Sequence, residues 1–164
     1  MNKQKPFLFL VVLLTLGMSA SAQIRQGDPA KEIALPSAAG DTVRLSSLKG
    51  KVVLLDFWAS WCGPCRVSNK SLVKLYAKYR SKGFEIYGVS LDESKNKWTQ
   101  AIKQDKIAWI QVNDPGGWDA STAVQWGINA IPTSYLIDKN GKLLAMDLEG
   151  KDLEKALKYL LEEK

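Results

Sequence analysis

A buried strand runs into the start of a helix in the stretch Val53-Leu54-Leu55-Asp56-Phe57-Trp58-Ala59-Ser60-Trp61-Cys62-Gly63-Pro64-Cys65. Residues 52–58 form an almost continuous apolar run that only Asp56 interrupts, a pattern typical of a strand covered on both faces. From Pro64 onward, apolar residues recur at helical spacing and would form one helix face: Val67, Leu72, Leu75, Tyr76 and Tyr79. We therefore expect a central strand that ends beside the first turn of a helix.

Cys62 and Cys65 are the two cysteines of the chain, and both lie at this junction. At a helix N-terminus, the helix dipole and the unpaired backbone N–H groups favour the thiolate, which is the form of cysteine that attacks disulfides. Cys65 lies one turn further in, where it would be shielded and suited to resolving a mixed disulfide. Pro64 fits a first helical turn because its missing N–H has no intrahelical partner there. The motif indicates thiol–disulfide exchange.

A structural disulfide and a metal site are the alternatives for this cysteine pair. A bridge that closes so short a loop restricts the unfolded chain little, which limits its stabilisation to roughly 2 kcal/mol. Two thiolates fill only half of a tetrahedral zinc site, and the chain has no histidine to complete it. We therefore expect a redox-active disulfide and no metal.

The composition is that of an ordinary folded domain. Of the 164 residues, 46% are hydrophobic and 24% are charged, which favours one compact domain. The formal net charge of +6 is spread along the chain without a basic block, so it indicates no nucleic-acid partner. The absence of histidine excludes a histidine haem ligand, a Ser-His-Asp triad and a histidine general base. Chemistry must come from thiols, carboxylates, amines or hydroxyls, and we expect no cofactor.

The N-terminal segment has the pattern of a secretory signal peptide. Lys3 and Lys5 precede an apolar run at residues 7–16, and small residues follow at 19–22. We expect cleavage after Ala22, which leaves one domain at residues 23–164 and lowers the formal net charge from +6 to +4. An uncleaved anchor is the alternative, but residues 7–22 fall short of the roughly 20 apolar residues that span a bilayer. The mature protein should be soluble in an exported, oxidising compartment such as the periplasm.

Strand and helix patterns alternate along the rest of the chain. Strands are expected at residues 33–35, 43–45, 84–91, 107–112, 133–137 and 142–147. Helices are expected from about Ser94, at residues 119–126 with Gly127 after the last turn, and from a cap at Asp152 that buries Leu153, Leu157, Leu160 and Leu161. The turn Asp138-Lys139-Asn140-Gly141 is a strong hairpin signal. This order predicts an α/β domain with a mixed sheet flanked by helices and an N-terminal hairpin.

Two segments carry a resemblance to the thioredoxin superfamily: residues 53–65 and the downstream stretch Gly127-Ile128-Asn129-Ala130-Ile131-Pro132-Thr133. Other segments resemble the exported TlpA/ResA-like thiol-disulfide oxidoreductases, namely residues 27–29, 48–51, 89–92 and 136–141, together with Trp98. An extra helix and strand at about residues 94–112 is a feature of that branch which plain thioredoxins lack. The resemblance covers nearly all of residues 27–164 and implies a thioredoxin-like fold with this insertion.

The resemblance also implies roles for individual residues. Cys62 would be the attacking cysteine and Cys65 the resolving one. Pro132 would be in cis and lie against the disulfide, so that the backbone of Ile131 faces the site and can pair with a substrate strand. Trp61 would be an exposed apolar contact for that substrate, whereas Trp58 is more simply a core residue.

Asp56 is an isolated acid in an apolar strand. Burial should raise its pKa and let it relay a proton to or from Cys65. The alternative is a hydrogen-bonded structural carboxylate.

Some positions depart from the pattern of the branch. Many TlpA/ResA-like members carry a glutamate three positions after the second cysteine and a proline two positions further on, where this chain has Ser68 and Lys70. Any partner choice or pKa tuning that depends on that glutamate is therefore in doubt. Lys31 and Ile33 stand where the branch has proline and an aromatic residue. Neither difference affects the core thiol chemistry.

The direction of electron flow follows from the dipeptide between the cysteines. The Cys-Gly-Pro-Cys sequence resembles that of reducing thioredoxins, with potentials of about −270 mV, rather than that of strong oxidants at about −120 mV. The difference corresponds to roughly 7 kcal/mol for two electrons. We therefore hypothesise a monomeric reductase of protein disulfides, with apocytochromes c among the candidate substrates and a membrane-embedded reductase as electron donor.

Two other functions remain as alternatives. A thiol peroxidase of the peroxiredoxin type would share the extra helix and strand, but its motif has Thr or Ser where this chain has Ala59 and proline where it has Leu55. A non-catalytic binding module would use the surface of Trp61 and Ile131, with the disulfide as a static clip. Rapid oxidation by micromolar peroxide would favour the first, and failure to reduce an exposed protein disulfide would favour the second.

Overall fold

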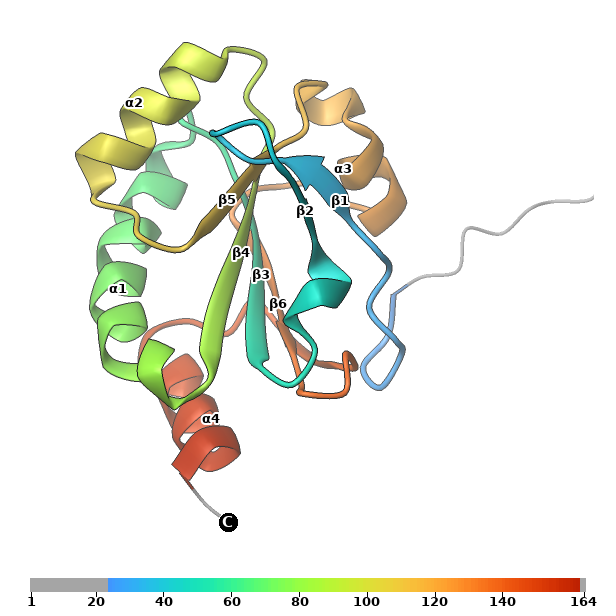
Figure 1. Ribbon diagram of the computed structural model, residues 1–164, viewed down its shortest axis with the longest axis vertical. Helices are drawn as coiled ribbons and strands as arrows, with labels where there is room; N and C mark the ends of the chain where they lie inside the picture. The colour runs from blue at the N-terminus through green and yellow to red at the C-terminus, as the bar shows by residue number, and fades with distance from the viewer. Residues whose placement is uncertain (1–23, 163–164) are drawn as a thin grey trace, which may run out of the picture.

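A five-stranded sheet lies at the centre of the molecule, with β3 in the middle (Figure 1). The computed structural model describes residues 24–162, so the expected signal peptide at residues 1–22 lies outside the described residues. The strands are β1 (Ala34–Pro36), β2 (Thr42–Arg44), β3 (Val52–Trp58), β4 (Phe84–Ser90), β5 (Ile110–Asn113), β6 (Thr133–Ile137) and β7 (Leu143–Met146). The α-helices are α1 (Gly63–Tyr79), α2 (Lys95–Asp105), α3 (Ser121–Trp126) and α4 (Gly150–Glu162), and the 3-10 segments are η1 (Leu45–Leu48), η2 (Arg80–Lys82) and η3 (Gly117–Asp119).

The sheet is mixed and has the strand order β5-β4-β3-β6-β7. β3, β4 and β5 run parallel, whereas β6 is antiparallel to both β3 and β7. Every residue of β3 is buried, as its apolar run predicts. β1 and β2 form a separate antiparallel hairpin that opens the domain. The predicted α/β class, the mixed sheet and the N-terminal hairpin are confirmed.

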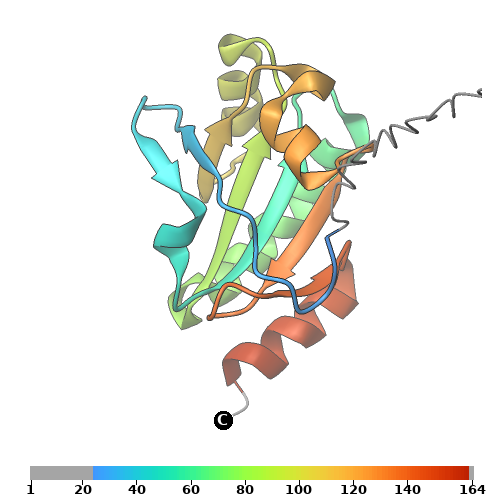
Figure 2. The same cartoon turned by 90° about the vertical axis from the view of Figure 1, so that its right-hand side faces the viewer.

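The two faces of the sheet bury two different clusters because successive side chains of a strand point to opposite faces. Val53, Leu55 and Phe57 of β3 pack in a cluster with residues of η1 and α3. Val52 and Leu54 pack in the other cluster, with apolar residues of α1 and α4. Figure 1 shows α1 and α2 to the left of the sheet and the β1–β2 hairpin with α3 to its right, and Figure 2 shows the hairpin and α3 lying in front of the strands. Asp56 therefore faces the side that α1 covers.

Two predicted turns have the backbone that their sequences favour. In the turn between β6 and β7, the Asp138 carboxylate accepts hydrogen bonds from the backbone N–H groups of Asn140 and Lys142, both at 2.8 Å, and Gly141 has φ +84°. Gly127 ends α3 in the left-handed conformation with φ +66°. Both glycines occupy conformations that residues with a Cβ rarely adopt.

For two helical residues, the burial or the position in the helix differs from the prediction. Val67 is 66% exposed rather than buried with Leu72, because its side of α1 borders an open pocket. Asp152 lies in the first turn of α4 rather than at its cap. Glu149 precedes the helix, and its backbone oxygen accepts hydrogen bonds from the N–H groups of Asp152 and Leu153.

Two segments near the insertion have different boundaries from those expected. The chain turns at Lys106 in a left-handed conformation and the N–H of Ile107 bonds back to the end of α2, so β5 pairs with β4 only from Ile110. The helix expected at residues 119–126 is divided into η3 and α3, because Ala120 between them has extended backbone angles.

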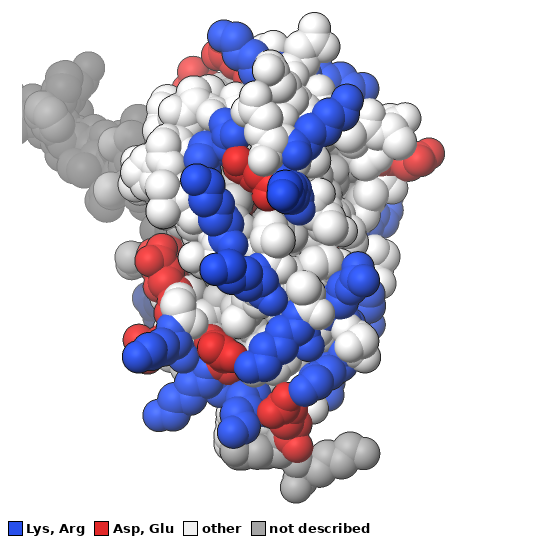
Figure 3. Space-filling view, turned by 90° about the vertical axis from the view of Figure 1, so that its left-hand side faces the viewer, with Lys and Arg blue, Asp and Glu red and all other residues white. Residues whose placement is uncertain are grey.

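Basic side chains gather on the side of α1 and α2, as Figure 3 shows. On α1, basic residues recur every four positions and so lie along one face: Arg66, Lys70, Lys74 and Lys78. The residues at the two ends of this row are paired, Arg66 with Asp105 and Lys78 with Glu154. The periodicity of α1 thus places on one face basic residues that are four positions apart in the sequence. No helix within residues 24–162 is long and apolar enough to cross a membrane.

Candidate functional site

The two cysteines form a disulfide at the start of α1, with an S–S distance of 2.02 Å. Cys62 is the N-cap residue of the helix, and its Sγ accepts a hydrogen bond from the backbone N–H of Cys65 at 3.1 Å. Cys62 is 6% exposed and Cys65 is 1% exposed. Cys62 is thus the slightly more exposed residue of the two, and Cys65 is shielded, as the sequence predicts. A helix N-terminus stabilises negative charge, so this position favours a thiolate on Cys62 after reduction.

The loop before β6 lies against this disulfide. The peptide bond between Ile131 and Pro132 is cis, as the resemblance implies. The backbone oxygen of Ile131 lies 3.7 Å from Cys62 Sγ. Residues nearly seventy positions apart in the chain therefore meet at the sulfur that a substrate would reach first.

Two tryptophans form an exposed aromatic pair beside the cysteines. Trp61 is 53% exposed and Trp118 of η3 is 49% exposed, with their ring centroids 5.9 Å apart. Trp58, in contrast, is buried and donates a hydrogen bond from its Nε1 to Gln111. Trp61 is thus exposed and Trp58 buried, as expected, and the contact of Trp61 with substrate stays a prediction. Trp118 did not emerge from the sequence, because it lies after a Pro-Gly-Gly loop with no spacing that links it to the cysteines.

A buried polar network holds the loop that carries Trp61. The Asp92 carboxylate, in a residue only 1% exposed, accepts hydrogen bonds from the backbone N–H and the hydroxyl of Ser60. The hydroxyl of Ser90 also donates to it, at 2.8 Å. Asn113 donates from its side chain to the backbone oxygens of Ser90 and Asp92. The residues at and just after the ends of β4 and β5 thus fix Ser60, which directly precedes Trp61.

Arg66 fastens the first turn of α1 to α2. Its guanidinium forms a two-point salt bridge with the buried carboxylate of Asp105 and also donates to the backbone oxygen of Ser60 at 3.2 Å. Asn69 donates to the same carboxylate at 3.0 Å. Burial opposes ionisation of Asp105, but the hydrogen bonds from Arg66 and Asn69 and the charge of Arg66 outweigh it and hold the pKa of Asp105 below its usual value.

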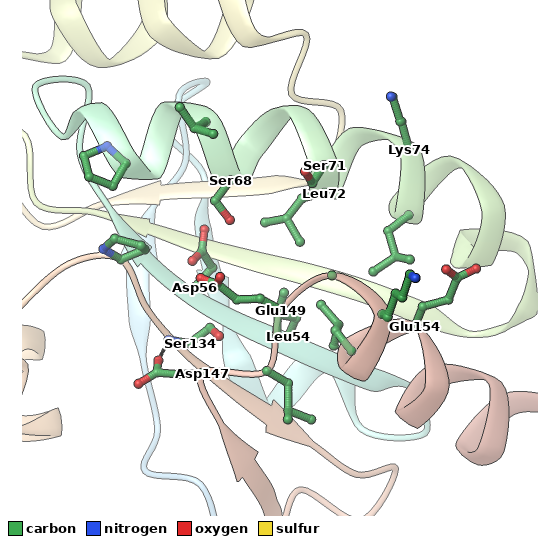
Figure 4. Close-up of a pocket in the computed structure, with 18 of the residues that line it drawn as sticks. Leu54, Asp56, Ser68, Ser71, Leu72, Lys74, Ser134, Asp147, Glu149 and Glu154 are labelled. Carbon is green, nitrogen blue, oxygen red and sulfur yellow. Dashed lines mark hydrogen bonds between the residues drawn. The ribbon is translucent and has the colours of Figure 1, made fainter.

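An open pocket of about 820 Å³ lies beside the disulfide, between α1, the sheet and the start of α4. Pro64 and Pro132 form its end nearest the cysteines. Four acids line it, namely Asp56, Asp147, Glu149 and Glu154. Figure 4 shows Asp56, Ser68 and Glu149 pointing toward one another inside it. The pocket thus leads from solvent to the acid of the central strand.

Asp56 is 5% exposed, and its carboxyl group makes no hydrogen bond within residues 24–162. Burial, followed by the negative charges of Glu149 and Asp147, raises the pKa of Asp56 to about 7. A carboxyl group with such a pKa exchanges protons readily near neutral pH. The geometry therefore favours a proton-handling role for Asp56 over that of a hydrogen-bonded structural carboxylate.

Two of the positions that depart from the branch pattern, Ser68 and Lys70, are on α1. Ser68 is half-buried and lines the pocket on the side of Asp56, whereas Lys70 is exposed. The wall where the branch usually has a glutamate therefore carries a neutral hydroxyl in this chain.

Comparison with known proteins agrees with the fold and the cysteine site. The sequence pattern of the Redoxin family matches residues 25–161. The chain is 30% identical over 172 aligned residues to the thiol-disulfide oxidoreductase ResA of Bacillus cereus, with 98% of this chain and 97% of the relative covered.

Solved structures give the same result. The thioredoxin domain of a thiol-disulfide oxidoreductase from Bacteroides vulgatus superposes with a TM-score of 0.79 at 34% identity, covering 85% of this chain and 99% of that domain. A thiol-disulfide oxidoreductase from Bacteroides fragilis superposes with a TM-score of 0.76 at 38% identity, covering 82% of this chain and 100% of the other. The chain therefore belongs to the Redoxin family and is a thioredoxin-like thiol-disulfide oxidoreductase of the TlpA/ResA-like branch.

Proposed function

We propose that this protein is an exported reductase of protein disulfides that works through Cys62 and Cys65. The observation that carries the proposal is the position of Cys62 Sγ, at the N-terminus of α1 and 3.7 Å from the backbone oxygen of Ile131. A thiolate is favoured at that point, and an extended substrate segment can pair with the adjacent backbone.

The reaction transfers two electrons from the dithiol to the substrate. The Cys62 thiolate attacks one sulfur of a substrate disulfide, forming a mixed disulfide and releasing the other substrate sulfur as a thiolate. Cys65 loses its proton and attacks Cys62 Sγ, which forms the Cys62–Cys65 disulfide and releases the second substrate thiolate. The substrate thiolates take protons from water. A separate dithiol donor then reduces the Cys62–Cys65 disulfide.

Asp56 is the base that we assign to Cys65. Its carboxylate takes the Cys65 proton during resolution, and its neutral form returns a proton when the site is reduced again. Asp56→Ala should therefore slow the resolution of a preformed mixed disulfide at neutral pH by about a hundredfold or more, the lower end of the range for general base catalysis. Stopped-flow rates that are unchanged by the substitution would remove this role.

Substrate contacts come from the surface around Cys62. The backbone of Ile131 beside Pro132 offers hydrogen-bonding groups to an extended segment, and Trp61 offers an exposed apolar face. These contacts suit an unfolded or extended protein segment that carries a disulfide, and apocytochrome c is the candidate that the family resemblance suggests.

The proposal also includes the cellular compartment of the protein and its electron donor. The N-terminal pattern supports export with cleavage after Ala22 and a soluble monomer in the periplasm. A reductant in an oxidising compartment has to be recharged from elsewhere, which favours a membrane-embedded reductase as electron donor.

The test is to trap the natural partners. Cys65→Ser leaves Cys62 able to attack but removes the resolving thiol, so mixed disulfides should accumulate on Cys62 in the native compartment and be identified by mass spectrometry. Cys62→Ser is the matched control and should trap nothing through the same position. A trapped cytochrome or membrane reductase would support the proposal, and the absence of any mixed disulfide would contradict it.

A redox titration tests the proposed direction of electron flow, from this protein to the substrate disulfide. A potential of about −270 mV, in the range of reducing thioredoxins, is expected. A value above about −150 mV would overturn the reducing direction.

A further inference from the structure

Glu149 lies where the acidic pocket opens to solvent. It is exposed, whereas Asp56 on the same pocket is almost fully buried, and the Asp56 carboxyl group has no hydrogen-bond partner within residues 24–162. In Figure 4 the side chain of Glu149 reaches toward the carboxyl group of Asp56. Glu149 therefore lies beside the route by which a proton can pass between Asp56 and solvent.

The loop that carries Glu149 is fixed at both ends. Asp147 and Ser134 of β6 are joined by two hydrogen bonds of 2.8 Å, one from the backbone N–H of each residue. Asp147 has φ +53°, a left-handed conformation that costs free energy for a residue with a Cβ. At the other end, the backbone oxygen of Glu149 accepts from the first turn of α4. The position of Glu149 is therefore set by the sheet and the helix together.

The charged groups around Asp56 come from three elements. The β7–α4 loop contributes Asp147 and Glu149, and α4 contributes Lys151 and Glu154 to the pocket. α1 contributes Lys74 and Lys78. On β4, the residue paired with Asp56 is Gly88, which is uncharged.

The carboxylate of Glu149 differs from those of Asp147 and Glu154 because it makes no hydrogen bond within the described residues. The Asp147 carboxylate accepts a hydrogen bond from Ser134, and the Glu154 carboxylate is bonded to Lys78. Among the described residues that line the pocket, Glu149 is the acid besides Asp56 whose side chain makes no hydrogen bond. No other described group of the pocket therefore holds its carboxylate.

We propose that Glu149 passes the proton of Asp56 to and from solvent, and that it acts on the cysteines through Asp56. The proposal rests on the role proposed above for Asp56. During resolution, the Cys65 thiol gives its proton to the Asp56 carboxylate, Cys65 sulfur bonds to Cys62 sulfur, and the substrate thiolate leaves. Neutral Asp56 then gives the proton to the Glu149 carboxylate, which releases it to water. The opposite wall carries Ser68, which has no carboxylate to offer.

The negative charge of Glu149 has a second effect on Asp56. It disfavours the Asp56 carboxylate and, with burial and Asp147, contributes to the raised pKa. Removing that charge should lower the pH at which Asp56 loses its proton. The same substitution should therefore alter both the rate and the pH dependence of resolution.

The experiment compares Glu149→Gln with wild type and with the control Glu154→Gln, an acid of the same pocket that is bonded to Lys78 instead. Resolution of a preformed mixed disulfide is followed by stopped flow from pH 5 to 9. Glu149→Gln should lower the maximal rate by about tenfold. It should also shift the acidic limb to lower pH by about one unit. Added imidazole should restore the rate of Glu149→Gln and leave that of Glu154→Gln unchanged.

A second measurement needs no turnover. The 13C resonance of the Asp56 carboxyl group, followed against pH in the oxidised protein, should titrate at lower pH in Glu149→Gln than in wild type. An unshifted titration, or a full rate without imidazole rescue, would overturn the proposal while wild-type reduction persists. Failure of wild type to reduce any protein disulfide would instead contradict the proposed function.

Discussion

Asp56 occupies a position that a folded protein ordinarily gives to an apolar residue. It lies in a strand whose every residue is buried, and no hydrogen bond within the described residues compensates for its burial. A buried carboxylate without a hydrogen-bond partner destabilises the fold, so its presence at this position favours a functional reason.

The destabilisation of the folded state by buried Asp56 should depend on pH. Its pKa is about 7 in the folded protein against 3.8 for an ordinary aspartate, so between these values the folded state binds more protons than the unfolded state. The stability of the protein should therefore fall as pH rises from about 4 to about 7. Asp56→Asn should raise the free energy of unfolding by about 2 to 4 kcal/mol at pH 8 and leave it nearly unchanged at pH 4.

Urea denaturation at the two pH values measures this effect. Asp119→Asn is a suitable control because Asp119 is exposed, and it should change the free energy of unfolding little at either pH. An equal effect of Asp56→Asn at pH 4 and pH 8 would contradict the assignment of the cost to the ionised carboxylate.

At the scale of elements, α1 is held to α2 by the salt bridge between Arg66 and Asp105. Because the pKa of Asp105 is lowered in the folded protein, the ion pair stabilises the fold above pH 3.8 and loses that effect as pH falls below it. Arg66→Ala leaves a buried carboxylate with only Asn69 as a partner. It should lower the free energy of unfolding by about 2 kcal/mol at pH 7 and by less at pH 3.

The same denaturation assay tests this prediction. Lys78→Ala, which removes the exposed salt bridge to Glu154, provides a matched control and should have little effect. If both substitutions lower the free energy of unfolding equally, burial does not explain how much the Arg66–Asp105 salt bridge stabilises the fold.

The pair Trp61–Trp118 joins the cysteine loop to η3, an element of the segment that follows the insertion. Both rings are about half exposed, so together they offer an apolar surface beside Cys62. Trp118→Ala should raise the KM for a protein disulfide such as that of insulin about fivefold, equivalent to about 1 kcal/mol of lost aromatic contact. The kcat should stay unchanged.

Steady-state kinetics with a protein disulfide and with a small disulfide that lacks aromatic groups distinguish an effect of Trp118 on substrate binding from an effect on the cysteines. The small disulfide should be reduced equally well by wild type and Trp118→Ala. Tyr159→Ala, which removes an exposed aromatic residue from α4, should leave the KM for insulin unchanged. A fall in kcat for both substrates would mean that Trp118 acts on the cysteines rather than on substrate.

At the scale of the whole molecule, the N-terminal pattern predicts a shorter mature chain. When the full gene product is expressed in a bacterium with a periplasm, the exported form should begin at Gln23, as determined by N-terminal sequencing or intact mass. Leu13→Arg, which places a charge in the apolar run, should keep the protein unprocessed inside the cell. Recovery of an uncleaved exported chain would favour a membrane anchor instead.

Much of the fold follows from local sequence patterns. The apolar run of β3, the helical spacing after Pro64 and the Asp138–Gly141 turn each constrain the backbone over a few residues, and all three lie where expected. The errors occur where tertiary contacts override local patterns. The strand β5 starts at Ile110 because pairing with Tyr87 begins there, and Val67 is exposed because a pocket lies on its side of α1.

The sequence by itself determined the cysteine pair at a strand-to-helix junction, the isolated acid at Asp56 and the apolar periodicity that makes the sheet. Each of these is a property of neighbouring residues, because the backbone periods of strands and helices dictate which side chains share a face. Only the tertiary structure decided which distant residues meet them. Glu149 faces Asp56, and Trp118 lies on Trp61, because packing of the sheet, η3 and α4 brings together segments whose spacing in the chain carries no such information.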